Sequence, residues 1–162
     1  MQSPTDQDGD SRDVMDGLRR LVRELRTASI AAERMTELSG AQLFVLRILV
    51  REPGLGISQL AARTLTDQSS VSVVVAKLVA RRLVKRGRAP DDARRLVLLP
   101  TAAGTRLAAG GPDPAQERLF AGLARLNPAV RRRLARDLAL WTAAIGIDDR
   151  APGMFFEPSR HG

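Results

Sequence analysis

The sequence predicts a mainly α-helical protein with one small β-hairpin, and three observations lead to this fold class. Apolar residues recur at three- and four-residue steps along most of the chain, which is the period of an amphipathic helix. Two short apolar runs, LVKR at 83–86 and RLVLL at 95–99, flank a loop rich in Gly, Pro and Asp, as the strands of a hairpin do. With 162 residues, the chain is long enough for one compact domain with its own core.

The N-terminal third of the sequence contains a tail and two helices. Residues 1–12 are polar and acidic, so we expect a disordered tail there. Over residues 13–38 the apolar residues form one helical stripe, which predicts a long amphipathic helix. Ser39 is the predicted N-cap of a second helix, AQLFVLRILVRE, which Pro53-Gly54 ends.

Two further helices are expected before the hairpin. ISQLAART, at 57–64, is a short helix that Ser58 is predicted to cap, and Thr66 and Asp67 are expected to cap the helix that follows. That second helix has an inward face with the helical spacing i, i+3, i+4 and i+7, formed by Val71, Val74, Val75 and Leu78. Its outward face is small and rich in hydroxyl groups, and consists of Ser69, Ser70, Ser72, Val73, Ala76 and Lys77.

The chain is predicted to return to helix over residues 101–147. Gly110-Gly111-Pro112 should interrupt this region, and Asn127-Pro128 is expected to start the last helix as N-cap and first helical residue. A small domain would have little left to cover the apolar stripe of this last helix, which includes Leu134, Leu138 and Trp141. Residues 148–162 are rich in Pro and Gly, so we expect a flexible tail.

The charge of the chain points to an anionic partner. The net charge is +8, and residues 51–100 carry ten basic against four acidic residues, whereas residues 1–16 carry five aspartates against one arginine. A solvated basic face without a partner is the alternative interpretation of the same charge.

Several function classes are disfavoured. No apolar stretch approaches 18 residues and the acidic start lacks the features of a signal peptide, so we expect a cytoplasmic protein that does not span a membrane. The sequence has no cysteine and no tyrosine, and its single histidine, His161, lies in the expected tail. We therefore predict neither an enzyme nor a metal site nor a bound cofactor.

The order of elements over residues 39–100 is that of a winged helix-turn-helix, in which the second helix of the pair enters the major groove of DNA. Serine hydroxyls on the outward face can reach phosphates or base edges, the Val73 side chain can contact thymine methyls, and Lys77 can neutralise a phosphate. Long cationic side chains lie on or beside the hairpin tip, where they can reach the minor groove or its phosphates: Arg86, Arg88, Arg94 and Arg95.

Residues 13–147 resemble the MarR family of bacterial transcriptional regulators. The resemblance depends on an Asp-x-Arg in the wing, Asp92-Ala93-Arg94, followed a strand later by a Thr-x-x-Gly, Thr101-Ala102-Ala103-Gly104. It implies a homodimer whose first and last helices interlock, and which docks one recognition helix and one wing per subunit on a palindromic operator. The expected interface residues are Leu18, Leu21, Leu25, Leu134, Leu138 and Trp141.

The same resemblance implies roles for individual residues and a class of ligand. The carboxylate of Asp92 is expected to orient Arg94, which enters the minor groove. A small aromatic or phenolic anion is expected to act as an effector between the dimer helices and the DNA-binding lobe. The chain departs from the family at two positions: Arg82 replaces the usual glycine after the recognition helix, and Val73 occupies a position that is commonly polar or basic.

The residues thus predict a sequence-specific DNA-binding transcriptional regulator that represses by blocking polymerase. Two alternatives stay open, namely a non-specific architectural DNA-binding protein and a helical protein-interaction dimer. The serines at 69–72 have helix capping as an alternative role. The arginines at 131–133 point in three directions around a helix, so we expect a solvated or dimer-flanking face there and not a binding site.

Overall fold

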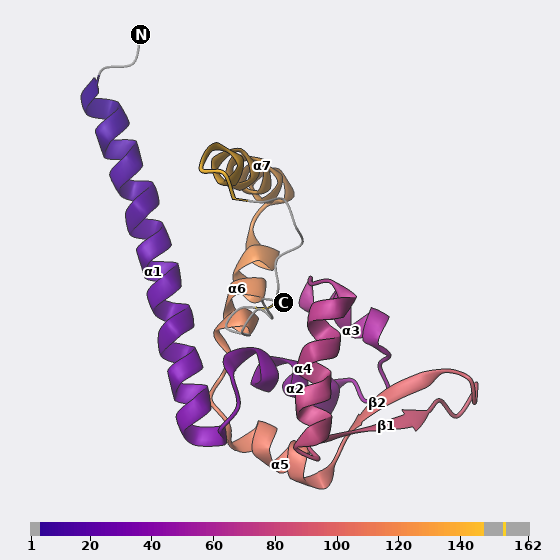
Figure 1. Cartoon of the computed structure of the whole chain (residues 1–162). Coiled ribbons are helices and arrows are strands. Elements are labelled where there is room, and N and C mark those ends of the chain that lie inside the picture. Colours follow the sequence, from indigo (N-terminus) through magenta and orange to yellow (C-terminus); the bar gives the residue numbers. More distant parts are fainter. Residues whose placement is uncertain (1–3, 148–153, 155–162) are drawn as a thin grey trace.

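The computed structural model describes residues 4–147 and Met154, and this part of the chain forms helices and one hairpin in the predicted order (Figure 1). The elements are α1 (Pro4–Thr36), α2 (Gly40–Arg51), α3 (Ile57–Thr64), α4 (Gln68–Ala80), β1 (Val84–Arg88), β2 (Leu96–Pro100), α5 (Ala102–Gly110), α6 (Ala115–Arg125) and α7 (Pro128–Ala144). Within the described residues, none of the helices combines the length and the apolar character that crossing a bilayer requires.

Helix α2 occupies the centre of a compact lobe. It packs against α1, α3, α4, α5, α6 and strand β2, and eight of its twelve residues are buried. The core around it is aliphatic, and its largest fully buried side chains include Leu38, Leu43, Leu46, Leu49, Leu60 and Leu78. Helix α4 and the hairpin are therefore supported by one central helix, α2, because close-packed cores resist deformation.

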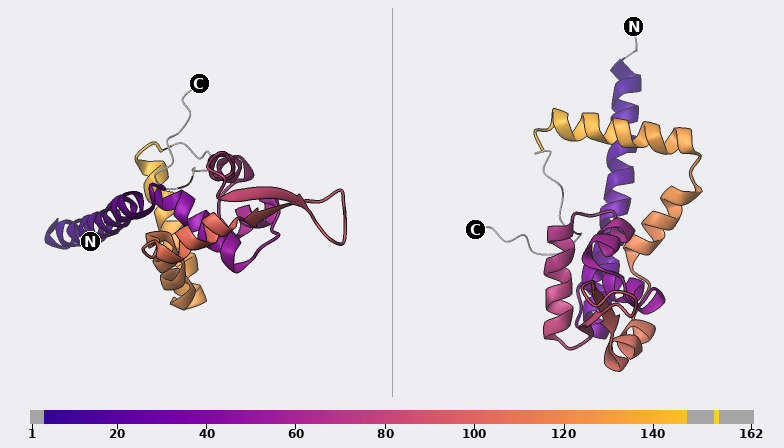
Figure 2. Two further views of the ribbon diagram at one scale, coloured as in Figure 1. Left: turned by 90° about the horizontal axis from the view of Figure 1, so that it is seen from below. Right: turned by 90° about the vertical axis from the view of Figure 1, so that its right-hand side faces the viewer.

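Helices α1, α6 and α7 form an arm that extends away from this lobe. Figures 1 and 2 show the N-terminal half of α1 projecting beyond the lobe, and α7 lying above the lobe in a direction roughly crosswise to α1. An ion pair between Arg118 and Glu24 joins α6 to α1. No residue of α7 is buried, so its apolar stripe, of which Leu138 is 47% exposed, is left uncovered by the part of the chain that the structure describes.

The expected dimer residues do not all lie on the uncovered surface. Leu18, Leu21, Leu134 and Leu138 are exposed and Trp141 is half-buried. Leu25 differs, because it is only 7% exposed in the single chain and packs inside the subunit. The assignment of Leu25 to a dimer interface stays a prediction, and its low exposure leaves it little surface to offer a second subunit.

Helix α1 begins earlier than the sequence suggested. Residues 4–12, for which we expected a disordered tail, are helical. Pro4 suits the first helical position because its φ is fixed and it lacks an N–H group, and carboxylates such as those of Asp8 and Asp10 are favoured near the positive end of a helix. At the other end of the chain, the expected flexible tail lies outside the described residues except for Met154, which is buried against the core of the lobe.

The helix starts follow local capping chemistry. Ser39 caps α2 as predicted, since its side chain accepts a hydrogen bond from the Gln42 N–H while Gln42 accepts one from the Ser39 N–H. The prediction of Ser58 as the cap of α3 is wrong. The helix starts one residue after Gly56, whose N–H donates to Oε1 of Gln59 at 3.0 Å. Asn127 and Pro128 open α7 as expected.

Helix α4 ends in a left-handed turn at Arg82. The Leu83 N–H donates to the Leu78 carbonyl at 3.0 Å and the Arg82 N–H donates to the Val79 carbonyl at 2.9 Å, which is the Schellman pattern. Arg82 has φ +57°, a conformation that favours glycine. The departure at this position therefore leaves the left-handed cap intact and places an arginine in it.

We expect Arg82→Gly to raise the free energy of unfolding by about 0.5 kcal/mol, because relief of the left-handed strain outweighs the extra backbone entropy of glycine in the unfolded chain. Urea denaturation monitored by circular dichroism measures this change. Arg82→Ala is the matched control, since it removes the same side chain but keeps the Cβ atom and the strain. Equal free energies of unfolding for Arg82→Gly and Arg82→Ala would contradict the presence of left-handed strain at this position.

Candidate nucleic-acid interface

Helix α4 presents the faces that the sequence predicted. Val71, Val74, Val75 and Leu78 are fully buried and anchor the helix to the lobe. On the opposite side Ser69, Ser72 and Ala76 are exposed, while Ser70, Val73 and Lys77 are partly exposed. The outward face is therefore small and polar, and open to a large partner.

The start of α4 uses two of its polar residues for capping. Asp67 accepts a hydrogen bond from the Ser70 N–H at 2.9 Å and a second from the Ser70 hydroxyl at 2.6 Å. These bonds lower the pKa of Asp67 below its ordinary value, so the cap stays ionised at neutral pH. The alternative role of capping thus applies to Ser70, whereas the hydroxyls of Ser69 and Ser72 make no hydrogen bond within the described residues.

The wing is a two-stranded antiparallel hairpin that projects from the side of the lobe (Figure 1). Its register pairs Val84 with Pro100 and Arg88 with Leu96, and an isolated bridge between Leu55 and Leu98 ties the hairpin to the start of the helix-turn-helix. β1 ends two residues later than the run 83–86 predicted, so Arg88 lies on a strand. The hairpin is thereby fixed at its base and free at its tip.

The tip of the wing is ordered by its own aspartates. Asp92 Oδ1 accepts a hydrogen bond from the backbone N–H of Arg94 at 2.9 Å, and the Arg95 guanidinium pairs with Asp91 at 2.7 Å. Arg95 lowers the pKa of Asp91 through its hydrogen bond. The Arg88 guanidinium donates to the Ala93 carbonyl at 2.8 Å and so closes the loop.

These contacts differ in one respect from what the resemblance implied. Asp92 holds the backbone of Arg94 and not its guanidinium, which makes no hydrogen bond within the described residues. The exposed side chains of Arg86 and Arg94 are likewise without an ion-pair partner there, while Arg88 and Arg95 are engaged in shaping the loop. Asp91, which the sequence analysis did not single out, is the partner that occupies Arg95.

The Thr-x-x-Gly motif joins the wing to α5. The Thr101 hydroxyl donates to the Arg82 carbonyl at 2.8 Å and accepts from the Gly104 N–H at 3.1 Å, and the Thr101 N–H donates to the Leu83 carbonyl at 3.0 Å. A Cβ atom on Gly104 would lie 2.1 Å from that same Leu83 oxygen. The motif therefore holds the base of the wing against the first turn of α5, and only glycine permits this approach.

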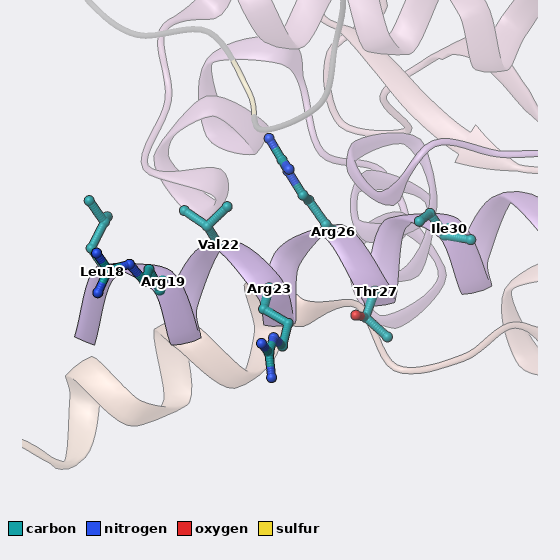
Figure 3. A pocket seen from close by; sticks show the side chains of 7 residues that line it. All are labelled: Leu18, Arg19, Val22, Arg23, Arg26, Thr27 and Ile30. Carbon is teal, nitrogen blue, oxygen red and sulfur yellow. The ribbon is translucent and has the colours of Figure 1, made fainter. Parts of the chain in front are cut away.

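An open hollow of about 410 Å³ runs along α1. Figure 3 shows Val22 and Arg26 projecting from one side of the helix and Arg23 and Thr27 from the other. All of its lining residues belong to α1, and they combine apolar and cationic side chains: Leu18, Arg19, Val22, Arg23, Arg26, Thr27 and Ile30. Among the described residues, the hollow is therefore lined by a single helix and is open on its other sides. The arginines at 131–133 lie on α7, away from α4 and the hairpin.

A capped helix pair, a recognition helix with an open polar face and an arginine-tipped hairpin define the winged helix-turn-helix class of protein. Residues 36–95 match the family model described as MarR family. The matched segment spans the helix-turn-helix and the hairpin as far as its tip. No curated protein gives a significant match to the sequence.

Solved structures share the fold of most of the chain. A MarR family transcription regulator is similar with a TM-score of 0.56 and 18% identity, over 87% of this chain and 93% of that one. The Staphylococcus aureus MepR–DNA complex gives a TM-score of 0.54 and 18% identity, over 81% and 97%. A MepR-like protein complexed with pseudoligands gives 0.54 and 20%, over 85% and 97%. At these identities the likeness shows the winged-helix fold.

Proposed function

We propose that this protein is a transcriptional repressor that binds a palindromic operator as a homodimer. The observation that carries the proposal is the pair of unengaged arginines on the wing, Arg86 and Arg94, beside the open face of α4. A guanidinium without an internal partner on an ordered hairpin is available to the negative potential of a narrow minor groove. The structure of a MepR–DNA complex with the same fold supports a nucleic-acid partner.

Each part of the interface has its own task in this proposal. Ser69, Ser72 and Lys77 contact phosphates or base edges in the major groove, and Val73 contacts a thymine methyl. Arg86 and Arg94 enter or flank the minor groove, while Arg88, Asp92 and Arg95 keep the tip in shape. Because few base-edge hydrogen bonds are available from α4, we expect specificity to depend strongly on the shape of the DNA.

The proposed homodimer accounts for the uncovered arm. Soluble monomers rarely leave contiguous apolar surface exposed, yet α7 has no buried residue and the outer part of α1 exposes Val14, Leu18 and Leu21. A two-fold pairing of these helices would bury both stripes at once. It would also place two recognition helices on half-sites about 10 bp apart.

A small-molecule effector is the remaining part of the proposal. The hollow on α1 offers three guanidinium groups beside three aliphatic side chains, which suits an aromatic or phenolic anion. A second subunit would supply the missing wall. The MepR-like protein in complex with pseudoligands, which has the same fold, supports ligand binding of this kind.

The test is to select duplexes from a random DNA library with the purified protein and to sequence those that are retained. We expect an enriched palindrome that the protein prefers over a scrambled duplex by roughly 10³-fold at fixed salt, together with a dimeric mass in sedimentation. A small ratio between the affinities for the palindrome and the scrambled duplex would indicate a non-specific architectural protein instead. Absence of retention would indicate a protein-interaction module and overturn the proposal.

A further inference from the structure

Polar contacts of one α2 residue, Arg47, join the lobe to the arm. We call this cluster the clasp, and it consists of Arg47, Pro112, Asp113 and Glu117. The guanidinium of Arg47 donates to the Pro112 carbonyl at 3.1 Å, pairs with Asp113 Oδ1 at 2.8 Å, and lies 3.5 Å from Glu117 Oε1. Its partners belong to the segment between α5 and α6 and to the first turn of α6. The side chains of Arg47 and Glu117 are only 23% and 19% exposed, so water screens this contact less than a surface ion pair.

Neighbouring contacts make the clasp close-fitting. Arg51 lies one turn further along α2. Its two terminal guanidinium nitrogens donate hydrogen bonds of 2.7 and 3.3 Å to the carboxylate oxygens of Glu117. A Cβ atom on Gly111 would lie 3.0 Å from Thr36 and 3.1 Å from Leu43, so the connecting segment lies directly on the end of α1 and on α2. Phe44 of α2 and Phe120 of α6 pack edge to face with ring centroids 5.5 Å apart.

The segment that the clasp holds contains one residue with wide backbone freedom, Gly111. Gly111, Pro112, Asp113 and Pro114 connect α5 to α6, and Gly111, the C-cap of α5, has an extended backbone. Pro112 and Pro114 fix their own φ angles, so a change in the relative direction of the two helices would occur mainly at Gly111. Arginine suits the role because its planar fork fixes several acceptors in one geometry, which a lysine ammonium does not.

We propose that Arg47 is a positioning residue, which sets the direction of the arm relative to the lobe and thereby the separation of the two recognition helices in the dimer. Few elements separate Arg47 from the recognition helix and from the arm. Helix α2 packs directly against both α4 and α6, and two residues connect α6 to α7. The inference rests on the proposed function, because the separation exists only if the protein is a dimer.

The chain has no cysteine, so Ala76→Cys on the exposed face of α4 gives one spin-labelling site per subunit. Pulsed electron paramagnetic resonance on the DNA-free protein then measures the distance between the two recognition helices. We expect one narrow distribution in this parent protein. Adding Arg47→Met should broaden it or shift its mean by about 2 Å or more, the scale of helix movements at subunit interfaces.

Two further variants make the result specific to the clasp. Glu117→Gln keeps the size of the side chain and should broaden or shift the distribution as Arg47→Met does. Arg63→Met is the matched control, because Arg63 pairs with Glu52 at 2.8 Å within the lobe and should leave the distribution unchanged. A purely structural role would lower the melting temperature without changing the distance in the folded dimer.

The outcomes separate the two proposals. Arg47→Met and Glu117→Gln dimers with the parent distribution would overturn the positioning role and leave the repressor proposal standing. Absence of any distance signal in the parent protein would overturn the homodimer and, with it, both proposals. A second readout is the half-site spacing in selected duplexes, which we expect to be sharp for the parent and relaxed for Arg47→Met.

Discussion

Gly104→Ala is expected to lower the free energy of unfolding by about 3 kcal/mol, the upper end of the usual cost of overpacking. The added Cβ atom would lie 2.1 Å from the Leu83 carbonyl oxygen, and that oxygen cannot turn away because it accepts the Thr101 N–H. Helix α5 must therefore move off the end of the recognition helix. Urea denaturation followed by circular dichroism measures the loss.

Gly110→Ala is the control for this prediction. Gly110 ends the same helix, and a Cβ atom there would meet nothing within 4 Å. The substitution should raise the free energy of unfolding by about 0.5 kcal/mol, because alanine favours helix. If Gly104→Ala were as stable as Gly110→Ala, the close approach of α5 to Leu83 would not hold in solution.

Arg94→Ala is expected to weaken operator binding by about 1 to 3 kcal/mol and to reduce the slope of affinity against salt by about one. The Arg94 side chain makes no hydrogen bond within the described residues, while its backbone is held by Asp92, so the substitution should leave the hairpin and its stability intact. Fluorescence anisotropy with a selected duplex over a range of salt concentrations measures both quantities.

Arg132→Ala serves as the comparison for Arg94→Ala. Both arginines are exposed and both substitutions remove one positive charge, but Arg132 lies on α7, remote from the wing. We expect its variant to bind the duplex as the parent does. Equal losses for the two variants would mean that only net charge matters, and an unchanged affinity of Arg94→Ala would remove this residue from the interface.

Features of the fold that depend on nearby residues were predictable from the sequence. Ser39 and Asn127-Pro128 cap their helices through partners within three residues, and the inward valines of α4 follow from helical spacing alone. The prediction of Ser58 failed for a local reason: Gly56 and Gln59 form a competing cap two residues earlier. The order of elements, and with it the winged helix-turn-helix, followed from such signals.

Features that depend on distant residues were not predictable in this way. Leu25 belongs to the same apolar stripe as Leu18, and only the packing of the chain shows that one is buried and the other exposed. The clasp between Arg47 and Glu117 spans 70 positions, and neither residue stands out among the many charged ones. At the wing, the spacing of Asp92 and Arg94 indicated a contact but not that it is made by the backbone.

The lack of any buried residue in α7 has a consequence for how the protein forms in the cell. An isolated helix of this length is marginal in water, because nucleation costs more than its few internal hydrogen bonds return. A newly synthesised subunit would thus complete its lobe first and gain a firm C-terminal helix only on meeting another subunit. If the proposed homodimer forms, functional protein would accumulate with the square of the amount synthesised at low expression, so small changes in synthesis would be amplified in the amount of dimer.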